Sequence, residues 1–434
     1  MNVKSPRFTV LELLNKMDKQ AYSNLILDAA LNSSGFSSRD KGFVSRLFYG
    51  VVERKLTLEY VISLYSSKPL HKLDGGVVNI LKIGLYQILY MDSVPDNAAV
   101  NESVTLAKQS GQTRASGFVN AVLRNFIRDG KTIKYPQDKF ERLSIEFSCG
   151  IELVKQFCSD YSYETAEKIL KMSVASHGYY LRINSVKTNT ETVLNELISC
   201  GYDAKPCSQV DNCIIVESLS GIENNDLFKN GYFHVQDLSS QLCCKALNPK
   251  PGETLIDLCA APGGKAFTLT EMMNNEGRIY ACDLHQKRVN LIKMGAERLG
   301  LTSIYAMQND AKLFNAELPS ADKILCDVPC SGFGVIRSKP EIKYTNLADV
   351  KKLPEVQYDI LCTASRYLKQ GGELVYSTCT LSKAENDMVI DRFLEEHSDF
   401  EPDNVFENGN SYKKVIFPDE CEGFFISKIR KAGR

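Results

Sequence analysis

The stretch "TLIDLCAAPGGKAFTLTEMM", Thr254–Met273, joins a short apolar run to a loop of small residues and glycines, and that loop to a helical pattern. Apolar runs and helical segments continue to alternate as far as "GELVYSTC", Gly372–Cys379. Such alternation is typical of a doubly wound parallel sheet with helices on both faces. The sequence therefore predicts an α/β domain over residues 246–434.

The expected strands of this domain end in chemically reactive side chains. In chain order these are Asp257 with Cys259, Asp283, Asp310, Asp327 and Cys379. Ligands of open parallel sheets bind outside the carboxyl ends of the strands. Buried strands rarely end in carboxylates for packing reasons, because an ionised group needs a partner or solvent. We therefore expect a functional site at this edge of the sheet.

The loop Cys259–Lys265, "CAAPGGK", lets backbone N–H groups approach a ligand at the start of a helix. Neither the dinucleotide fingerprint nor the P-loop pattern occurs in the chain. Asp283 lies 20 residues beyond Gly263, where an acid typically binds ribose hydroxyls. These features favour a nucleoside ligand without a pyrophosphate, with S-adenosylmethionine as the leading candidate. Asp310 is then placed to accept a hydrogen bond from the adenine amino group, or to cap a helix over residues 311–318.

The rest of the chain divides into two parts by pattern. Residues 1–130 carry helical patterns only, such as the apolar stripe Ile80, Leu81, Leu85, Ile88 and Leu89, and predict an all-α bundle. Residues 131–245 mix helical patterns with short strand-like runs and predict a small α+β module. Its strands offer either an RNA platform, with Arg182 and Asn184 as polar contacts, or an ordinary sheet surface.

Composition limits the setting in which the protein works. The chain has no apolar run long enough to cross a bilayer and no secretory signal pattern, so we expect a cytoplasmic protein. Its 14 cysteines contain no Cys-x-x-Cys pair, and its five histidines are scattered, so we expect no metal site. The net charge is -1, but residues 1–130 alone carry +5, which agrees with an RNA-facing helical part or with an ordinary solvated surface.

Three motifs carry a resemblance to a known family. "LCAAPGGK", "DVPCSGFGVIRSKPEIKY" and "LVYSTCTLSKAEND", in this order, resemble the RNA cytosine-5 methyltransferases of the Sun/Fmu type. The N-terminal "LKIGLYQILYMDSVPDNAAVNESVTLAK" and "GFVNAVLRNF" are similar to the NusB-like helical domain of the RsmB branch, which methylates a cytosine in small-subunit ribosomal RNA. Ala266, Val328 and Tyr344 depart from the usual family residues, and none of these changes removes a reactive group.

The resemblance implies a Rossmann-like class I methyltransferase domain and assigns roles to site residues. It implies that S-adenosylmethionine is contacted by Cys259, Ala260, Ala261, Pro262, Gly263, Gly264, Lys265, Asp283, Asp310 and Asp327. It further implies that Cys379 is the nucleophile and that Cys330 helps to release the product. The implied partner is small-subunit ribosomal RNA, and we expect a monomer.

The reaction explains why two cysteines and an acid are needed. Cytosine C5 becomes nucleophilic only after a thiolate adds at C6, and the resulting adduct resolves only when a second group helps to remove the C5 proton. The residues alone leave open which of Cys330 and Cys379 attacks. Asp327, if burial keeps it protonated, supplies a proton near N3. We expect Cys243, Cys244, Cys326 and Cys362 to be inert.

The target cytosine must leave any base stack, so a single-stranded or looped base is expected, with Arg337, Lys339 and Lys343 as phosphate contacts or as solvated loop charges.

The same chemistry on transfer RNA or on another ribosomal site is the first alternative. A NusB-like RNA-binding or assembly factor without catalysis is the second, and the intact site residues disfavour it. An adenine N6-methyltransferase is excluded, because "DVPC" lacks the turn that such enzymes carry.

Overall fold

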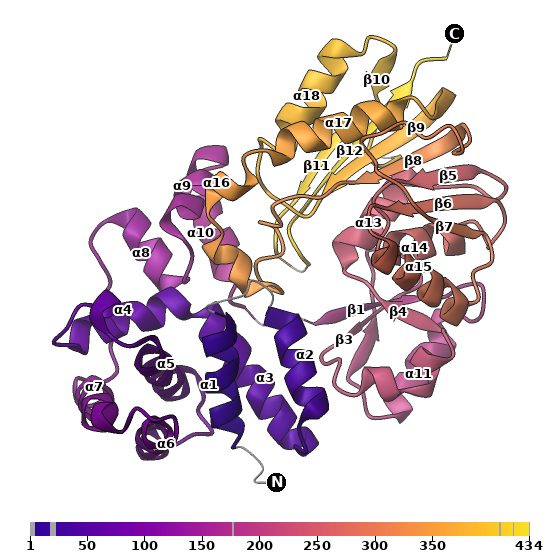
Figure 1. Cartoon of the computed structure of the whole chain (residues 1–434). Coiled ribbons are helices and arrows are strands. Elements are labelled where there is room, and N and C mark those ends of the chain that lie inside the picture. The colour runs from indigo at the N-terminus through magenta and orange to yellow at the C-terminus, as the bar shows by residue number, and fades with distance from the viewer. Residues whose placement is uncertain (1–4, 18–22, 176–177, 408, 420, 434) are drawn as a thin grey trace. The chain divides into compact units, whose positions relative to one another are not determined.

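The computed structural model describes residues 5–17, 23–175, 178–407, 409–419 and 421–433. Two compact units make up the chain (Figure 1): residues 1–174 together with 338–345, and residues 175–337 together with 346–434. The expected boundaries at residues 130 and 245 stay predictions. Among the helices of the described ranges, we find none with the length and apolar run that crossing a membrane requires.

The first unit is helical, as expected for the N-terminal part. Its helices are α1 Pro6–Met17, α2 Ser23–Ser33, α3 Ser38–Glu53, α4 Lys55–Tyr65, η1 Leu70–Lys72, α5 Gly75–Tyr90, α6 Asp96–Gln109, η2 Thr113–Ala115, α7 Ser116–Arg128, α8 Lys139–Glu146, α9 Ile151–Asp160, α10 Tyr163–Met172 and η4 Pro340–Tyr344. Helix α5 is its centre, with every residue from Val77 to Ile88 buried. The sequence showed one apolar stripe on α5, but a helix that is almost wholly apolar is enclosed on all sides.

The segment 338–345 belongs to this helical unit, although it follows the Cys330 motif directly in sequence. Lys343 is fully buried and donates from Nζ to the carbonyl of Phe147 at 3.0 Å. The Tyr344 hydroxyl donates to the carbonyls of Val52 at 2.7 Å and Glu53 at 2.9 Å. The interpretation of Lys343 as a phosphate contact is therefore wrong, because its ammonium satisfies a backbone carbonyl inside the unit.

The second unit begins with a four-stranded antiparallel sheet in the order β2-β3-β1-β4. Its elements are β1 Tyr179–Ile183, α11 Thr190–Ser199, β2 Ala204–Pro206, β3 Cys213–Val216, η3 Ile222–Asn224, α12 Asp226–Lys229 and β4 Phe233–Val235. One face packs an apolar cluster that includes Leu181, Val193 and Phe233. This module confirms the expected α+β character.

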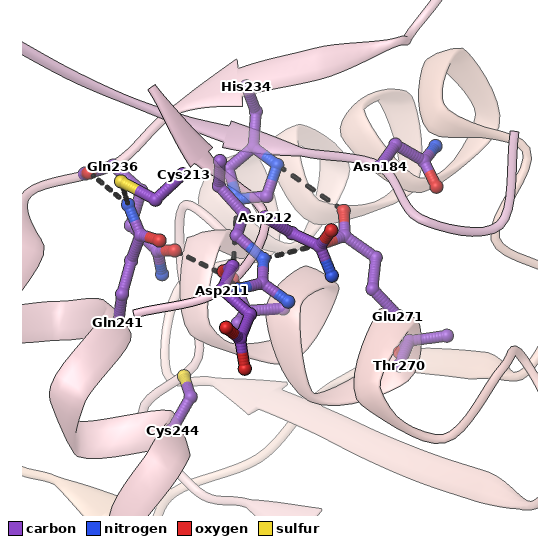
Figure 2. Close-up of polar contacts among 12 residues, drawn as sticks. Asn184, Asp211, Asn212, Cys213, His234, Gln236, Gln241, Cys244, Thr270 and Glu271 are labelled. Atoms are coloured by element: carbon purple, nitrogen blue, oxygen red, sulfur yellow. Dashed lines mark hydrogen bonds and ion pairs between the residues drawn. The ribbon is translucent and has the colours of Figure 1, made fainter. Parts of the chain in front are cut away.

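The other face of the small sheet is buried as well, which contradicts the RNA-platform interpretation. Arg182 is 6% exposed and donates from Nε to Glu271 Oε2 at 3.0 Å. Asn184 is fully buried and donates to the carbonyls of Gly231 at 2.9 Å and Leu299 at 2.8 Å. Figure 2 shows the surrounding polar cluster, in which His234 points toward Glu271. Neither Arg182 nor Asn184 is available to RNA, because each satisfies a buried partner.

The large sheet has the order β10-β12-β9-β8-β5-β6-β7, and β11 pairs with β12. Its strands are β5 Thr254–Asp257, β6 Arg278–Asp283, β7 Ile304–Gln308, β8 Ala321–Asp327, β9 Leu368–Thr378, β10 Phe400–Pro402, β11 Lys413–Ile416 and β12 Phe424–Lys431. Strands β5 to β9 are parallel, as predicted. Strands β10, β11 and β12 pair antiparallel, so the sheet is mixed rather than purely parallel.

Helices cover both faces of the large sheet (Figure 1). They are α13 Leu238–Leu247, α14 Gly264–Met272, α15 Gln286–Leu299, α17 Leu353–Ser365 and α18 Asp387–Glu396, and the short helix α16 Leu347–Val350 precedes α17 in the chain. Neighbouring strand residues such as Leu255 and Ile256 enter separate apolar clusters, because successive side chains point to opposite faces. Both faces are therefore core, and the carboxyl edge of the parallel strands is where polar side chains gather.

Candidate active site

Two cysteines meet at the carboxyl edge of strands β8 and β9. Asp327, the last residue of β8, pairs with Ser377 near the end of β9, so the two strands finish side by side. Cys330 lies three residues beyond β8 and Cys379 directly follows β9. Their Sγ atoms are 3.2 Å apart, and both side chains are partly exposed. The structure thus brings together the two cysteines that the sequence placed at adjacent strand ends.

The two thiols are not equivalent. The hydrogen bond to Cys379 raises the pKa of Cys330, and burial and the charge of Glu385 raise it further. Either sulfur could donate the hydrogen bond between them, and the raised pKa of Cys330 favours Cys330 as the donor. A thiol that accepts such a hydrogen bond is better stabilised as a thiolate, so the geometry favours Cys379 as the reactive sulfur.

A partly exposed ion pair lies at the same edge. Lys265, in the first turn of α14, places its Nζ 2.7 Å from Asp327 Oδ2, and the Ser377 hydroxyl donates to Asp327 Oδ1 at 2.9 Å. Burial lowers the pKa of Lys265, but the Asp327 carboxylate outweighs it and leaves the pKa above its ordinary value. Lys265 Nζ also lies 5.1 Å from the ring centroid of Phe424. The site therefore holds a charged ammonium against a carboxylate.

The loop Cys259–Lys265 connects β5 to α14 and has the backbone that its glycines allow. Gly263 has φ +114°, and a Cβ at this position would lie 2.3 Å from the Phe267 ring, so only glycine fits. Asp257, at the end of β5, is 1% exposed and accepts a hydrogen bond from the Cys259 N–H at 3.3 Å. Burial, with the nearby Asp327 charge, raises the pKa of Asp257 to about 7. A tight loop above a buried acid fits the cradle of a nucleoside ligand that carries hydrogen-bond donors.

Two further acids stand at the ends of β6 and β7. Asp283 accepts a hydrogen bond from the His285 N–H at 3.0 Å, and its Oδ2 lies 3.2 Å from Arg288. Asp310 accepts from the Lys312 N–H at 3.0 Å. Residues 311–318 form turns rather than a helix, so the alternative of Asp310 as a helix cap is wrong. Asp310 caps a turn instead, through the hydrogen bond that it accepts from the Lys312 N–H.

The sequence did not reveal a buried polar network behind the two cysteines. Glu385 is 3% exposed and accepts hydrogen bonds from the backbone N–H of Ser331 and from Gln357 Nε2, both at 2.9 Å. The Ser331 hydroxyl donates to Glu385 Oε1 at 2.5 Å and lies 2.7 Å from the Thr380 hydroxyl. Glu385 lies in a turn six residues after Cys379, and no periodicity in the sequence marks it as buried.

A glycine pair fixes the backbone of the Cys379 loop. The Gly334 N–H donates to the Cys379 carbonyl at 2.9 Å, and the Gly423 N–H donates to the Gly334 carbonyl at 2.9 Å. A Cβ at Gly334 would lie 2.0 Å from the Gly423 oxygen and 2.9 Å from the Cys379 oxygen. Three loops therefore approach one another at a distance that excludes any side chain at Gly334.

The basic residues after Cys330 are largely unavailable to phosphate. Arg337 is 7% exposed and lies 3.8 Å from Glu422, and Lys343 is buried in the helical unit. Of the three expected phosphate contacts, only Lys339 is exposed. The interpretation of Arg337 and Lys343 as phosphate contacts is therefore wrong, because both side chains are buried.

The strand order, the polar carboxyl edge and the loop after β5 define a methyltransferase with a Rossmann-like fold. A family model described as "16S rRNA methyltransferase RsmB/F" matches residues 244–430, a NusB family model matches residues 4–128, and an RsmF/B-like ferredoxin-like domain matches residues 153–223. The "Probable ribosomal RNA small subunit methyltransferase B" of Bacillus subtilis (strain 168) is 39% identical over 450 residues, with 100% of both chains covered. The chain belongs to the RsmB/F family of 16S rRNA methyltransferases.

Solved structures agree with this assignment at the level of fold. "PH0851" is 22% identical and superposes with a TM-score of 0.83 over 99% of this chain and 100% of that chain. A methyltransferase homolog protein from Pyrococcus horikoshii is 27% identical, with a TM-score of 0.60 over 68% of this chain and 99% of that chain. The resemblance drawn from the three sequence motifs is confirmed.

Proposed function

We propose that this methyltransferase transfers the methyl group of S-adenosylmethionine to carbon 5 of a cytosine in small-subunit (16S) ribosomal RNA, through a covalent bond between Cys379 and C6 of the base. The observation that carries the proposal is the pair of thiols 3.2 Å apart beside the Asp327–Lys265 ion pair. The printed name of the Bacillus subtilis relative supports small-subunit ribosomal RNA as the substrate.

The carboxyl edge offers the groups that S-adenosylmethionine requires. The loop Cys259–Lys265 would hold it through backbone N–H groups, Asp283 would accept from the ribose hydroxyls, and Asp310 would accept from the adenine amino group. The bound cofactor supplies a methyl group on a positively charged sulfur. The buried Asp257 supports this assignment, because its second carboxylate oxygen makes no hydrogen bond to the described residues and so calls for a donor.

Cys379 begins the reaction by adding to C6. Cytosine C5 is a poor nucleophile, and addition of a thiolate at C6 places the electron density of the former double bond on C5. The Cys330 S–H directed at Cys379 stabilises the thiolate before attack. With C6 held by Cys379, C5 would be the atom that accepts the methyl group that bound S-adenosylmethionine would supply.

We place the Asp327–Lys265 pair next to N3 and the N4 amino group of the cytosine. Addition at C6 increases the negative charge at N3, which calls for a proton or a hydrogen-bond donor. The sequence pointed to a protonated Asp327 as that donor, but both carboxyl oxygens of Asp327 accept hydrogen bonds, Oδ2 from the Lys265 ammonium at 2.7 Å and Oδ1 from the Ser377 hydroxyl at 2.9 Å. We therefore assign the donor role to Lys265, and Asp327 accepts from the N4 amino group.

Cys330 completes the cycle. After methyl transfer C5 still carries its proton, and removal of this proton returns its electron pair to the C5–C6 bond and expels the Cys379 thiolate. Cys330 stands 3.2 Å from the sulfur that leaves and is the natural proton relay for this step: its S–H proton passes to the departing Cys379 sulfur as it takes up the C5 proton. Without it the protein stays joined to methylated RNA.

The helical unit and the target base complete the proposal. A base enters a pocket of this kind only when it is unstacked, so a looped or single-stranded cytosine is the substrate. The net charge of +5 over residues 1–130 and the NusB family match support RNA contact by the helical unit. Transfer RNA or another ribosomal site remains the competing substrate, because the catalytic residues would be the same.

Transfer of tritiated methyl groups from S-adenosylmethionine to RNA transcripts tests the proposal, with wild type, Cys379→Ala and Cys330→Ala. Wild type is expected to label small-subunit ribosomal RNA and not transfer RNA. Cys330→Ala is expected to accumulate a denaturation-resistant protein–RNA adduct, while Cys379→Ala is inactive and forms none. The reverse pattern for the two cysteines would overturn the assignment of Cys379 as the nucleophile. Labelling of transfer RNA alone would show that the substrate is transfer RNA and not ribosomal RNA.

A further inference from the structure

The Glu385 network joins the residues that follow the two cysteines. Ser331 comes directly after Cys330, and Thr380 comes directly after Cys379. The Ser331 hydroxyl lies 2.7 Å from the Thr380 hydroxyl and donates to Glu385 Oε1. Glu385 thereby ties both cysteine loops to one carboxylate.

A second arm of the network fixes the turn before Cys330. Gln357, on α17 and fully buried, donates from Nε2 to the Pro329 carbonyl and to Glu385 Oε2, both at 2.9 Å. The Ser331 N–H donates to the same Oε2. The turn Pro329–Ser331 is therefore held on both sides of Cys330, which leaves its sulfur little freedom to move away from Cys379.

Glu385 has no cationic side chain as an ion-pair partner among the described residues. It is 3% exposed, and none of the ion pairs between residues of the described ranges includes it. A buried carboxylate that accepts three hydrogen bonds and has no cationic partner makes the electrostatic potential around it more negative. The nearest reactive group it affects is Cys330, whose pKa its charge helps to raise.

We propose that Glu385 is a positioning residue that assigns the roles of the two cysteines: through its hydrogen bonds to Ser331 and Gln357 it holds Cys330 against Cys379, so that Cys379 is the sulfur that attacks the base. The inference rests on the proposed function and deepens it. Glu385 touches neither the base nor the cofactor in this role and acts through the Pro329–Ser331 turn and through its charge.

The substitution Glu385→Gln separates the charge from the hydrogen bonds. The amide keeps one oxygen for the Ser331 N–H and Gln357, and its NH₂ can donate to the Ser331 hydroxyl, which turns to donate to Thr380. The loop geometry is thus retained while the charge is lost. Glu385→Ala removes both, and Glu395→Gln, an exposed position on α18, is the matched control.

Alkylation of Cys330 by iodoacetamide measures the effect without RNA. The pH dependence is followed by peptide mass spectrometry in the full chain carrying Cys379→Ala, so that the neighbouring thiol does not titrate. The other titratable groups that face this corner are Asp327 at the end of β8 and Tyr376 on β9, and both are unchanged in all variants. Glu385→Gln is expected to lower the midpoint for Cys330 by roughly one pH unit, the effect of one nearby charge, and Glu395→Gln is expected to leave it unchanged. An unchanged midpoint in Glu385→Gln would overturn the proposal.

A second measurement uses the RNA adduct with Cys379 restored. Glu385→Ala is expected to release the methylated adduct at least about tenfold more slowly than wild type, while the first methyl transfer proceeds. In Glu385→Gln, part of the adduct is expected on Cys330, because that thiol now ionises. Adduct on Cys379 alone with a wild-type release rate in both variants would contradict the inference. If Cys330→Ala forms no adduct on Cys379, the proposed function fails while the alkylation result stands.

Discussion

Substitution of Gly334 by alanine probes how closely the loop around Cys379 is packed. A Cβ at this position would lie 2.0 Å from the Gly423 oxygen and 2.9 Å from the Cys379 oxygen, whereas carbon and oxygen approach to about 3.3 Å. At least one loop must therefore move by about 1 Å, which breaks the hydrogen bonds from Gly334 to Cys379 and from Gly423 to Gly334. We expect a loss of about 3 to 5 kcal/mol, from about 1 kcal/mol for each hydrogen bond and about 1 to 3 kcal/mol for overpacking.

The consequence for catalysis is larger than the loss of stability. A reacting group displaced by about 1 Å costs about a hundredfold in rate, so we expect Gly334→Ala to lose at least that factor in methyl transfer while the chain still folds at low temperature. Methyl transfer and urea unfolding are measured on the same preparation. Gly117→Ala, exposed on α7 with nothing within 4 Å of the added Cβ, is the control and is expected to be neutral. Transfer within threefold of wild type in Gly334→Ala would refute the reasoning that this contact positions Cys379.

Three further predictions follow from buried charges and from the two thiols. Burial lowers the pKa of Lys343 from 10.5 to about 8, so the unfolded chain binds more protons than the folded chain between these two pH values. The free energy of unfolding should therefore rise with pH across this window, by at most about 3 kcal/mol. The urea midpoints of Lys343→Met at pH 7.5 and 10 should lack this rise. Glu271→Ala leaves Arg182 as a buried unpaired charge and should lower the free energy of unfolding in urea by about 3 to 5 kcal/mol. A loss below about 1 kcal/mol would show that the Arg182–Glu271 pair does not hold the small sheet in place. Hydrogen peroxide should oxidise Cys330 and Cys379 to a disulfide, with loss of two hydrogen atoms and of methyl transfer activity. Dithiothreitol should restore both the thiols and the activity. A peroxide-treated chain with both thiols free would contradict the 3.2 Å separation of the two sulfurs.

Local patterns in the sequence predicted the parallel strands and the acids at their ends, because each strand carries its own apolar run and its own terminal side chain. They also placed Cys330 and Cys379 at neighbouring strand ends, since consecutive parallel strands finish at one edge. The antiparallel strands β10 to β12 were not predicted, because the alternation of apolar runs and helical segments was followed only as far as Cys379.

Sequence patterns failed where the partner of a side chain lies far along the chain. Arg182 bonds to Glu271, 89 residues away, and Lys343 bonds to Phe147, 196 residues away, so neither could be recognised as buried. Glu385 was not singled out from the sequence, because nothing near it in sequence reveals Gln357 or Ser331. In each case a long-range polar contact, rather than local propensity, decides where the side chain lies.

The identity of the sulfur that is bonded to RNA tests the central claim most directly. Cys330→Ala is incubated with S-adenosylmethionine and small-subunit ribosomal RNA, the RNA is digested, and the protein is mapped by peptide mass spectrometry. We expect a methylated cytidine attached to Cys379, in the peptide that contains "LVYSTCT". An adduct on any other cysteine, or no adduct from a chain that still methylates the RNA, would contradict the account.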